Sequence, residues 1–215
     1  MENRRDKEAA GLPLNLIIES NDLQHYLEET EEADWSHLAV REKAAELFQD
    51  SDDELGFVQR AFEFVRDEIA HSWDIQSRRV TRRASEALFF REGICYAKSN
   101  LLCALLRSQG IPAGYCYQRL TLGDTPDTGY CIHALNAVYL KSEGRWIRLD
   151  ARGNKAGVDA QFSLTEEKLA FPVREEYKEA DYPVVYARPN PGTMDTLKRH
   201  TDCVEMYRHG LPASL

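Results

Sequence analysis

The sequence has no apolar run that approaches the roughly 20 residues needed to cross a bilayer. Its first ten residues are rich in charge, so they do not resemble a secretory leader. Basic residues are not in excess: 27 Lys and Arg stand against 36 Asp and Glu, for a formal charge of -9. These absences argue against nucleic acid or a membrane surface as a partner. We expect a cytoplasmic protein.

The chain also lacks the spacings of common metal and phosphate sites. Its five cysteines are an odd number without a Cys-x-x-Cys pair, so we expect free thiols, without a disulfide framework or a structural zinc site. There is no glycine-rich phosphate loop, and the acidic cluster at 50–54 lacks the glycine and the later glutamate of an EF-hand. The sequence therefore indicates no cofactor and no metal ligand. A Cys/His metal site stays an alternative, and calcium dependence stays open.

The composition that remains is typical of a soluble globular protein, with 215 residues, 43% of them apolar and 29% charged. We interpret residues 1–215 as a single domain with its core at about 55–150. Residues 1–54 are then a helical and strand extension. Residues 151–215 are a C-terminal extension, which we expect to cover a sheet edge or to form one wall of a cleft.

Apolar periodicity predicts several helices. Ser51–Glu54 has the sequence of a capping box ahead of an apolar stripe that runs from Leu55 to Ile69 at spacings of three and four. The Ala- and Leu-rich run from Tyr96 to Arg107, ended by Gly110 and Pro112, predicts a buried central helix. Further helices are predicted at Trp35–Phe48, at Thr81–Phe90, after a cap at Ser163–Glu166, and at Thr193–His209.

Strand-like segments follow the central helix at Ala113–Leu120, Tyr130–Leu140 and Arg145–Asp150. Because short turns join them, we expect an antiparallel sheet packed against the helix. The fold class is therefore α+β. Other predictions are a short strand at Leu14–Glu19, an edge strand at Pro183–Ala187 and a turn at Asn190–Gly192.

Cys95, His133 and Asp150 are the candidate chemical groups. Cys95 follows a glycine turn at the start of the central helix. A helix N-terminus and a nearby imidazole can lower the pKa of a thiol from about 8.5 to roughly 3.5–7.5. A strand holds His133 on one sheet face, and Asp150 at the end of the next strand could accept the other imidazole N–H. Each residue alone is more often structural, so the hypothesis depends on the combination.

The other cysteines and histidines have weaker settings. Cys103 lies two turns inside the helix, which predicts a packing role, and Cys131 shares a strand face with His133, which predicts a neighbour of the site. The arginine-rich segment 78–83 either recognises an acidic group near the cleft or forms a solvated face. The histidines without a comparable setting are His25, His37, His71, His200 and His209.

Several segments resemble the core of the transglutaminase-like superfamily, over about Phe62 to Asp150. They are Ala84–Leu88, Gly93–Leu102 with Gly-Ile-Cys-Tyr at its start, Leu105–Gly114 with Arg-Ser-Gln-Gly-Ile-Pro-Ala, His133-Ala134 and Gly144–Asp150. The resemblance implies a papain-like α+β fold, in which the helix that carries the cysteine packs against an antiparallel sheet. It also implies a Cys-His-Asp triad of Cys95, His133 and Asp150.

Two positions depart from that family pattern. Leu135-Asn136 stands where an aromatic and a polar or acidic residue usually follow the histidine, and Asp150-Ala151-Arg152 replaces the usual Asp-Pro-Thr. The three candidate groups are retained. The departures concern the surface that receives the substrate and the acceptor.

The implied reaction is acyl transfer on an amide or peptide bond through a thioester, completed by water or an amine. The partner is then a peptide, a protein or a small amide, while the oligomeric state stays unknown. One oxyanion donor could be the backbone N–H of Cys95. The side chains considered for oxyanion or substrate contact are Trp73, Gln76, Tyr96 and Asn136. The alternatives are a non-catalytic binding module of the same fold and a cysteine peptidase or amidase with a narrow small substrate.

Overall fold

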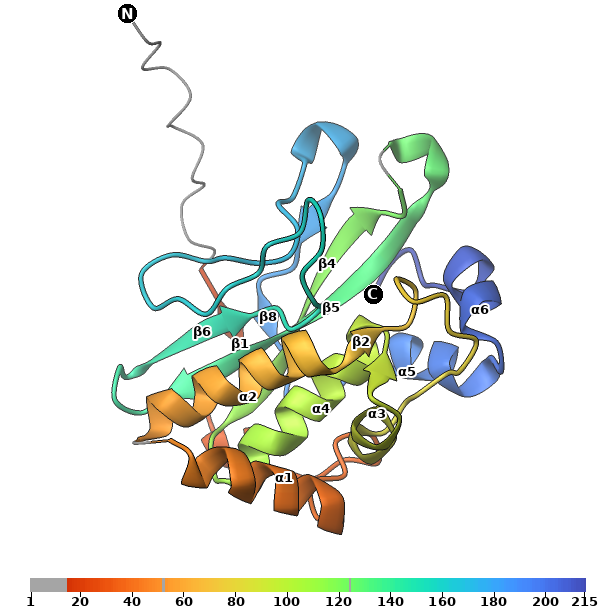
Figure 1. The fold of residues 1–215 in the computed structure, drawn as a ribbon. Coiled ribbons are helices and arrows are strands. Elements are labelled where there is room, and N and C mark those ends of the chain that lie inside the picture. Colours follow the sequence, from red (N-terminus) through yellow and green to blue (C-terminus); the bar gives the residue numbers. More distant parts are fainter. Residues whose placement is uncertain (1–14, 52, 124) are drawn as a thin grey trace, which may run out of the picture.

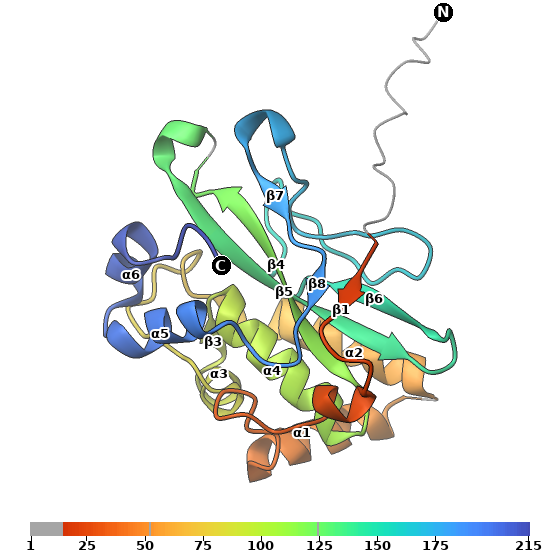
Figure 2. The same ribbon diagram turned by 180° about the vertical axis from the view of Figure 1, so that it is seen from behind.

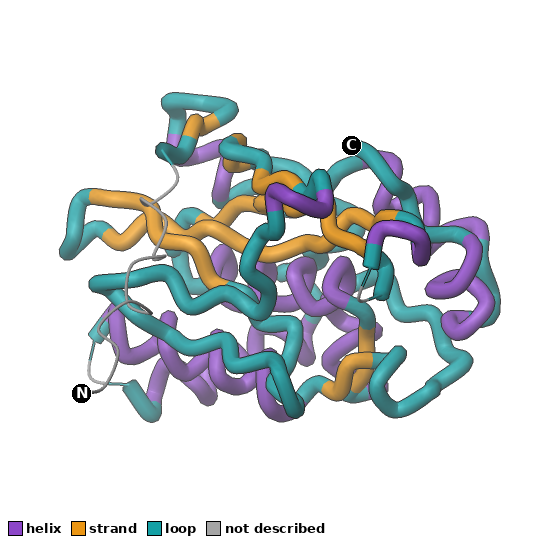
Figure 3. The backbone as a smooth tube through the Cα atoms, turned by 90° about the horizontal axis from the view of Figure 1, so that it is seen from above, coloured by secondary structure: helices purple, strands orange, loops and turns teal. Residues whose placement is uncertain are grey.

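Helices and an antiparallel sheet occupy separate layers in the computed structural model, which describes residues 15–51, 53–123 and 125–215 (Figure 1). From above, the long strands lie on one side and the longer helices on the other (Figure 3). This arrangement confirms the predicted α+β class. The elements are β1 (Ile17–Ile18), η1 (Leu23–Tyr26), α1 (Leu38–Gln49), α2 (Glu54–Glu68), β2 (Ala70–His71), α3 (Ala84–Phe90), β3 (Glu92–Gly93), α4 (Cys95–Ser108), β4 (Ala113–Thr121), η2 (Pro126–Thr128), β5 (Tyr130–Leu140), β6 (Arg145–Leu149), η3 (Glu175–Tyr177), β7 (Ala180–Asp181), β8 (Val184–Val185), α5 (Pro191–Arg199) and α6 (Cys203–His209).

The central sheet has the strand order β6-β5-β4-β7, and every neighbouring pair is antiparallel. The bounds of β4, β5 and β6 match the predicted strands within one residue at each end. Strand β7 comes from the part of the chain after residue 150 and pairs with β4 at Gln118↔Asp181. That part of the chain therefore covers one edge of the sheet, as expected.

Helix α4 is the centre of the core, and all its residues from Cys95 to Arg107 are buried. It packs against β4 and β5 on one side and against α1, α2 and α3 on the other (Figure 1). A helix covered on all sides needs apolar residues all round and internal partners for its polar ones. Arg107 meets this need by donating to the carbonyl oxygens of Ala113, Ala187 and Glu28. The predicted buried central helix is confirmed.

The N-terminus of α2 differs from the predicted capping box. The cap is Asp53, whose Oδ1 accepts the N–H of Gly56 at 2.8 Å. Ser51 instead donates its hydroxyl to the carbonyl of Leu47, at 2.7 Å, and so belongs to the end of α1. Asp52 lies outside the described residues. The prediction placed the helix correctly but chose the wrong capping residue, because both side chains are good caps.

Replacing Asp53 with Ala will lower the free energy of unfolding by about 1 kcal/mol, because the Gly56 N–H loses its acceptor. Urea unfolding followed by circular dichroism measures the loss. Ser51→Ala is the matched control, since it leaves the α2 cap in place. A larger loss of unfolding free energy for Ser51→Ala than for Asp53→Ala would show that Ser51 caps α2, as the sequence predicted.

The single helix predicted at 193–209 is two helices. Helix α5 ends at Arg199, and α6 starts at Cys203 after a short turn. Asp202 starts α6 by accepting the N–H groups of Val204 and Glu205, at 2.9 and 3.1 Å. An Asp in this position favours a new N-terminus over a continuing helix.

Two smaller predictions for the C-terminal region are also wrong. Asn190–Gly192 is the start of α5 and not a turn, with Asn190 as the cap and Pro191 in the first turn. No helix follows Ser163–Glu166, where the Ser163 hydroxyl accepts two nearby N–H groups in a turn.

The predicted strand at Leu14–Glu19 is present as β1, although Leu14 lies outside the described residues. It pairs in parallel with β8, which lies inside the edge strand predicted at Pro183–Ala187 (Figure 2). The division of the chain into a core at 55–150 and two extensions stays a prediction. Within the described part of the chain, none of the helices combines the length and apolarity needed to cross a membrane.

Candidate active site

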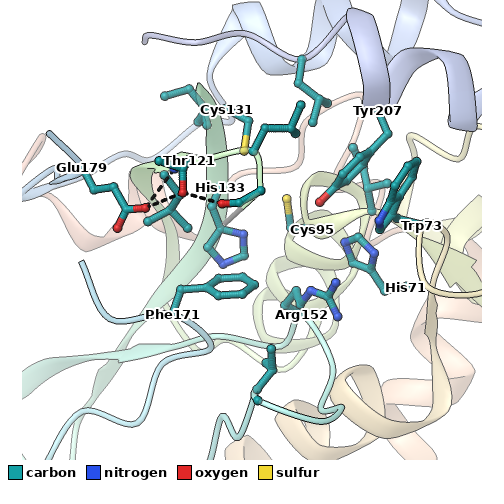
Figure 4. A pocket seen from close by; sticks show the side chains of 18 of the residues that line it. His71, Trp73, Cys95, Thr121, Cys131, His133, Arg152, Phe171, Glu179 and Tyr207 are labelled. Carbon is teal, nitrogen blue, oxygen red and sulfur yellow. Dashed lines mark hydrogen bonds between the residues drawn. The ribbon is translucent and has the colours of Figure 1, made fainter. Parts of the chain in front are cut away.

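A cavity of about 450 Å³ opens beside the first turn of α4 (Figure 4). Its walls come from the segment between α2 and α4, from the ends of β4 and β5, and from residues after 150. The C-terminal region therefore forms a wall of the cleft as well as covering a sheet edge. The lining residues with polar, charged or thiol side chains include His71, Trp73, Cys95, Thr121, Cys131, His133, Arg152, Lys155, Arg174, Glu179 and Tyr207.

Cys95 is the first residue of α4 and is 8% exposed. Its helix is 14 residues long, and the cap residue Ile94 has no side chain that could occupy the free N–H groups of the first turn. The short strand β3 comes just before Cys95 and pairs with β2, with His71 opposite Gly93. The thiol is thus held at the positive end of a helix dipole, on the cavity wall.

The imidazole of His133 lies between Cys95 and Asp150. Its Nε2 is 2.8 Å from Oδ2 of Asp150. Cys95 lies beside the ring at the cavity (Figure 4). Burial opposes the charged imidazole, but the charge and hydrogen bond of Asp150, with a further contribution from Cys95, raise the pKa of His133 above its usual value. The ring is therefore held in position and biased toward imidazolium.

Asp150 is 1% exposed and accepts three hydrogen bonds. They come from His133, from the N–H of Ala170 at 3.0 Å and from the N–H of Arg152 at 3.2 Å. Burial alone would raise the pKa of this carboxyl, but the charge of His133 and the hydrogen bonds lower it. The structure brings together all three residues singled out in the sequence.

An ion pair between the buried Arg152 and the more exposed Asp74 joins the C-terminal wall to the segment after α2. The guanidinium of Arg152 binds both carboxylate oxygens of Asp74, and Lys155 adds a contact to Asp74 at 2.7 Å. Although burial works the other way, these cations lower the pKa of Asp74. Arg152 also lies 5.8 Å from the ring centre of Phe171, whose ring meets that of His133 edge-on at 5.2 Å.

The cavity wall formed by His71 and Tyr207 was not expected from the sequence. His71 is 5% exposed and lines the cavity on the side of Cys95 away from His133 (Figure 4). Trp73 stacks on Tyr207, with ring centres 4.3 Å apart, and His71 meets Tyr207 edge-on at 6.1 Å. The expectation that His71 has no special setting is therefore wrong. Only the pairing of β2 with β3, which no local pattern indicates, could have revealed it.

Of the four residues considered for oxyanion or substrate contact, only Trp73 lines the cavity. Gln76 uses its amide to bind the carbonyl of Trp73, at 2.5 Å, within its own turn. The hydroxyl of Tyr96 donates to the carbonyl of Ile132 at 2.8 Å, and the buried amide of Asn136 donates to Ser99, Cys103 and Gly114 at 3.2 Å each. Gln76, Tyr96 and Asn136 are therefore structural in this fold, which corrects those predictions.

The remaining cysteines and arginines also have defined places. Cys103 is fully buried beside Asn136, in accord with packing, and Cys131 lines the cavity, as its shared strand face with His133 predicted. The arginine-rich segment 78–83 does not line the cavity. Its side chains form ion pairs with acidic residues of the chain, as in the pairs of Arg79 with Glu92 and of Arg82 with Glu32. Among the described residues, no group of three His, Cys, Asp or Glu side chains is placed to hold a metal ion.

The fold and the site together define a papain-like α+β protein with a thiol, an imidazole and a carboxylate in contact at the start of the central helix. The family model of the transglutaminase-like superfamily matches residues 41–151, which are 111 of the 215 residues. The chain belongs to the transglutaminase-like superfamily. At the level of the family, this membership supports a cysteine-dependent enzyme.

Solved structures of similar fold come from several proteins. A candidate cysteine protease from Cytophaga hutchinsonii aligns with a TM-score of 0.50 at 20% identity, over 65% of this chain and 46% of that chain. The periplasmic domain of TgpA from Pseudomonas aeruginosa gives 0.45 at 19% identity, over 61% and 48%. A TGase gives 0.40 at 16% identity, over 85% and 52%. The chain thus spans about half the length of these proteins, and the likeness concerns the fold alone. No curated protein matches the sequence.

Proposed function

We propose that this protein is a cysteine-dependent acyl-transfer enzyme that acts on an amide or peptide bond through a thioester. The observation that carries the proposal is the buried hydrogen bond of His133 to Asp150, with Cys95 beside the same imidazole on the wall of a cavity of about 450 Å³. Cys95 is the nucleophile, His133 the general base and acid, and Asp150 the group that orients the ring. The substrate is a peptide, a protein or a small amide, and the cytoplasmic location stays a prediction.

The first half of the reaction forms the thioester. The thiolate of Cys95 attacks the carbonyl carbon, a C–S bond forms, and the electron pair of the C=O bond moves to oxygen. The backbone N–H of Cys95, at the helix start, can stabilise this oxyanion. When the intermediate collapses, the C–N bond breaks and the imidazolium of His133 gives its proton to the departing amine.

The second half releases the acyl group. Water or a second amine loses a proton to His133 and attacks the thioester carbonyl, and the Cys95 thiolate leaves. Nothing in the three groups favours one acceptor over the other. The acceptor is therefore decided by experiment, with hydrolysis and transamidation as the two outcomes.

A thiol-directed probe tests the proposal. The purified protein is labelled near neutral pH in competition with glutamine-containing peptides and with small amides, and the labelled cysteine is identified by peptide mapping. We expect Cys95 to react first, protection by one class of amide, and an acyl adduct on Cys95 that added amine or water removes. Cys103→Ser is the control, because that buried thiol lies outside the cavity.

Two results would contradict the proposal. If Cys95 is labelled no faster than Cys103, the thiol is not activated. If Cys95 is labelled quickly but no amide protects it and no acyl adduct forms, the chain is a binding module that retains the fold without turnover.

A further inference from the structure

His71 is held in register with Cys95 by backbone pairing. Its strand β2 runs parallel to β3, with His71 opposite Gly93, and Ser72 donates its N–H to the carbonyl of Gly93 at 3.2 Å. Gly93 itself has no space for a side chain, since a Cβ would lie 2.9 Å from Ala97 and from Thr81. Because Gly93 precedes Cys95 by two residues, this packing fixes the imidazole relative to the thiol.

The ring of His71 lies at the cavity wall, and one of its nitrogen atoms has no hydrogen-bond partner among the described residues. The side chain is 5% exposed, and its Nδ1 is buried without a partner among the described residues. Figure 4 shows the ring beside Cys95, on the side away from His133. A buried polar group without a partner is unusual in a folded protein and calls for a ligand or an intermediate that supplies one.

The surroundings disfavour the charged form of this imidazole. Burial and the positive charge of Arg152 lower the pKa of His71 well below its usual value, against the smaller opposing effect of Asp74. A neutral imidazole carries one N–H, which can donate to a developing negative charge without giving up its proton. The two histidines of the cavity therefore differ in charge, with His133 biased toward the imidazolium and His71 toward the neutral ring.

Two residues of this segment, Trp73 and Gln76, were considered from the sequence. The Gln76 amide binds its own turn. Trp73 lines the cavity and stacks on Tyr207 through its ring face. His71 also lines the cavity, and among the described residues its buried Nδ1 has no hydrogen-bond partner.

We propose that His71 is a catalytic residue that donates a ring N–H to the oxyanion, together with the backbone N–H of Cys95. This inference depends on the proposed acyl transfer. When the thiolate of Cys95 attacks, the electron pair that moves to the carbonyl oxygen is stabilised by both N–H groups. As the intermediate collapses, the pair returns to form the thioester carbonyl, so His71 keeps its proton throughout.

Two reactions of the same thiol separate this role from a structural one. Acylation of Cys95 by p-nitrophenyl acetate passes through an oxyanion and releases p-nitrophenolate, which needs no proton. Alkylation by iodoacetamide displaces iodide from a tetrahedral carbon and forms no oxyanion. We expect His71→Ala to lower the acylation rate by about 100-fold while the alkylation rate stays within about two-fold of wild type, since loss of one oxyanion donor costs about 10²–10³ in rate.

Two further variants complete the experiment. His71→Gln restores an N–H donor and should recover a large part of the lost acylation rate. Ile75→Ala is the control, because Ile75 is exposed on the same turn, and it should leave both rates unchanged.

The proposal is overturned if His71→Ala acylates as fast as wild type, if both rates fall together, or if His71→Gln is no better than His71→Ala. Failure of the proposed function looks different, because wild-type Cys95 would then be alkylated but not acylated.

Discussion

Replacing His133 with Ala will slow the alkylation of Cys95 at pH 6 by about 100-fold, the loss expected when a thiolate loses its imidazolium partner. The raised pKa of His133 keeps the ring positively charged at this pH, beside the thiol. Without that charge, the helix N-terminus alone supports the thiolate. The measurement is the rate of iodoacetamide incorporation at Cys95, followed by mass spectrometry of the peptides.

Two controls test whether the lower alkylation rate is specific to the loss of the His133 ring. Cys103, buried within the same helix, reports any loosening of the fold, so its low rate should not change. His37→Ala removes an exposed histidine, whose ring makes no capping bond to its helix, and should alkylate like wild type. An alkylation rate in His133→Ala that equals the wild-type rate would show that the imidazole does not activate this thiol.

Replacing Asp150 with Ala will lower the free energy of unfolding by about 3–5 kcal/mol at pH 6, the usual cost of removing one partner of a buried ion pair. The carboxylate is the acceptor for His133, Ala170 and Arg152, and its loss leaves two backbone N–H groups and the buried imidazolium of His133 without an acceptor. Urea unfolding measures the difference. Asp195→Ala is the matched control, because Asp195 is exposed and, among the described residues, its ion pair is with Arg199, one turn away, at 3.4 Å.

The pH dependence of this difference follows from the two shifted pKa values. The pKa of Asp150 is lowered by folding, so its contribution is present above about 3.9, the unfolded value, and is lost as the pH falls through the folded value. The pKa of His133 is raised, so its contribution is complete below about 6.5 and is lost as the pH rises through the folded value. The stability gap between wild type and Asp150→Ala should therefore be largest between about pH 4 and 6.5. A gap that does not change with pH, or one no larger than that of Asp195→Ala, would contradict the assignment.

The elements predicted well from the sequence have their signal within a continuous stretch. Helix α4 and strands β4 to β6 carry uninterrupted apolar patterns with clear turns between them, and their observed bounds differ from the prediction by one residue or none. Errors arose where two local signals compete. Ser51 and Asp53 are both good caps, and Asp202 divides a helical pattern that looks continuous in the sequence.

In the candidate site too, some residues are indicated by patterns within a continuous stretch, and others are placed there by contacts between distant parts of the chain. Cys95, His133 and Asp150 were found because a helix start, two strands and a family resemblance all point to them. His71, Arg152, Phe171 and Tyr207 were not, because their place at the cavity depends on contacts across the chain, such as Arg152 with Asp74 and His71 with Tyr207. Asn136 was chosen for its position near His133, but its amide is directed to the backbone and thiol of its neighbours.

The sequence by itself determined the α+β class, the central helix, the antiparallel strands and the order of the three reactive groups. These features depend on hydrogen bonds and apolar periodicity between residues that are close in the chain. Only the tertiary structure decided which residues enclose the thiol, which of two histidines has a raised pKa and which a lowered one, and that residues after 150 form a wall of the cavity. The physical reason is that burial, pKa and side-chain direction depend on neighbours distant in sequence, which no local pattern encodes.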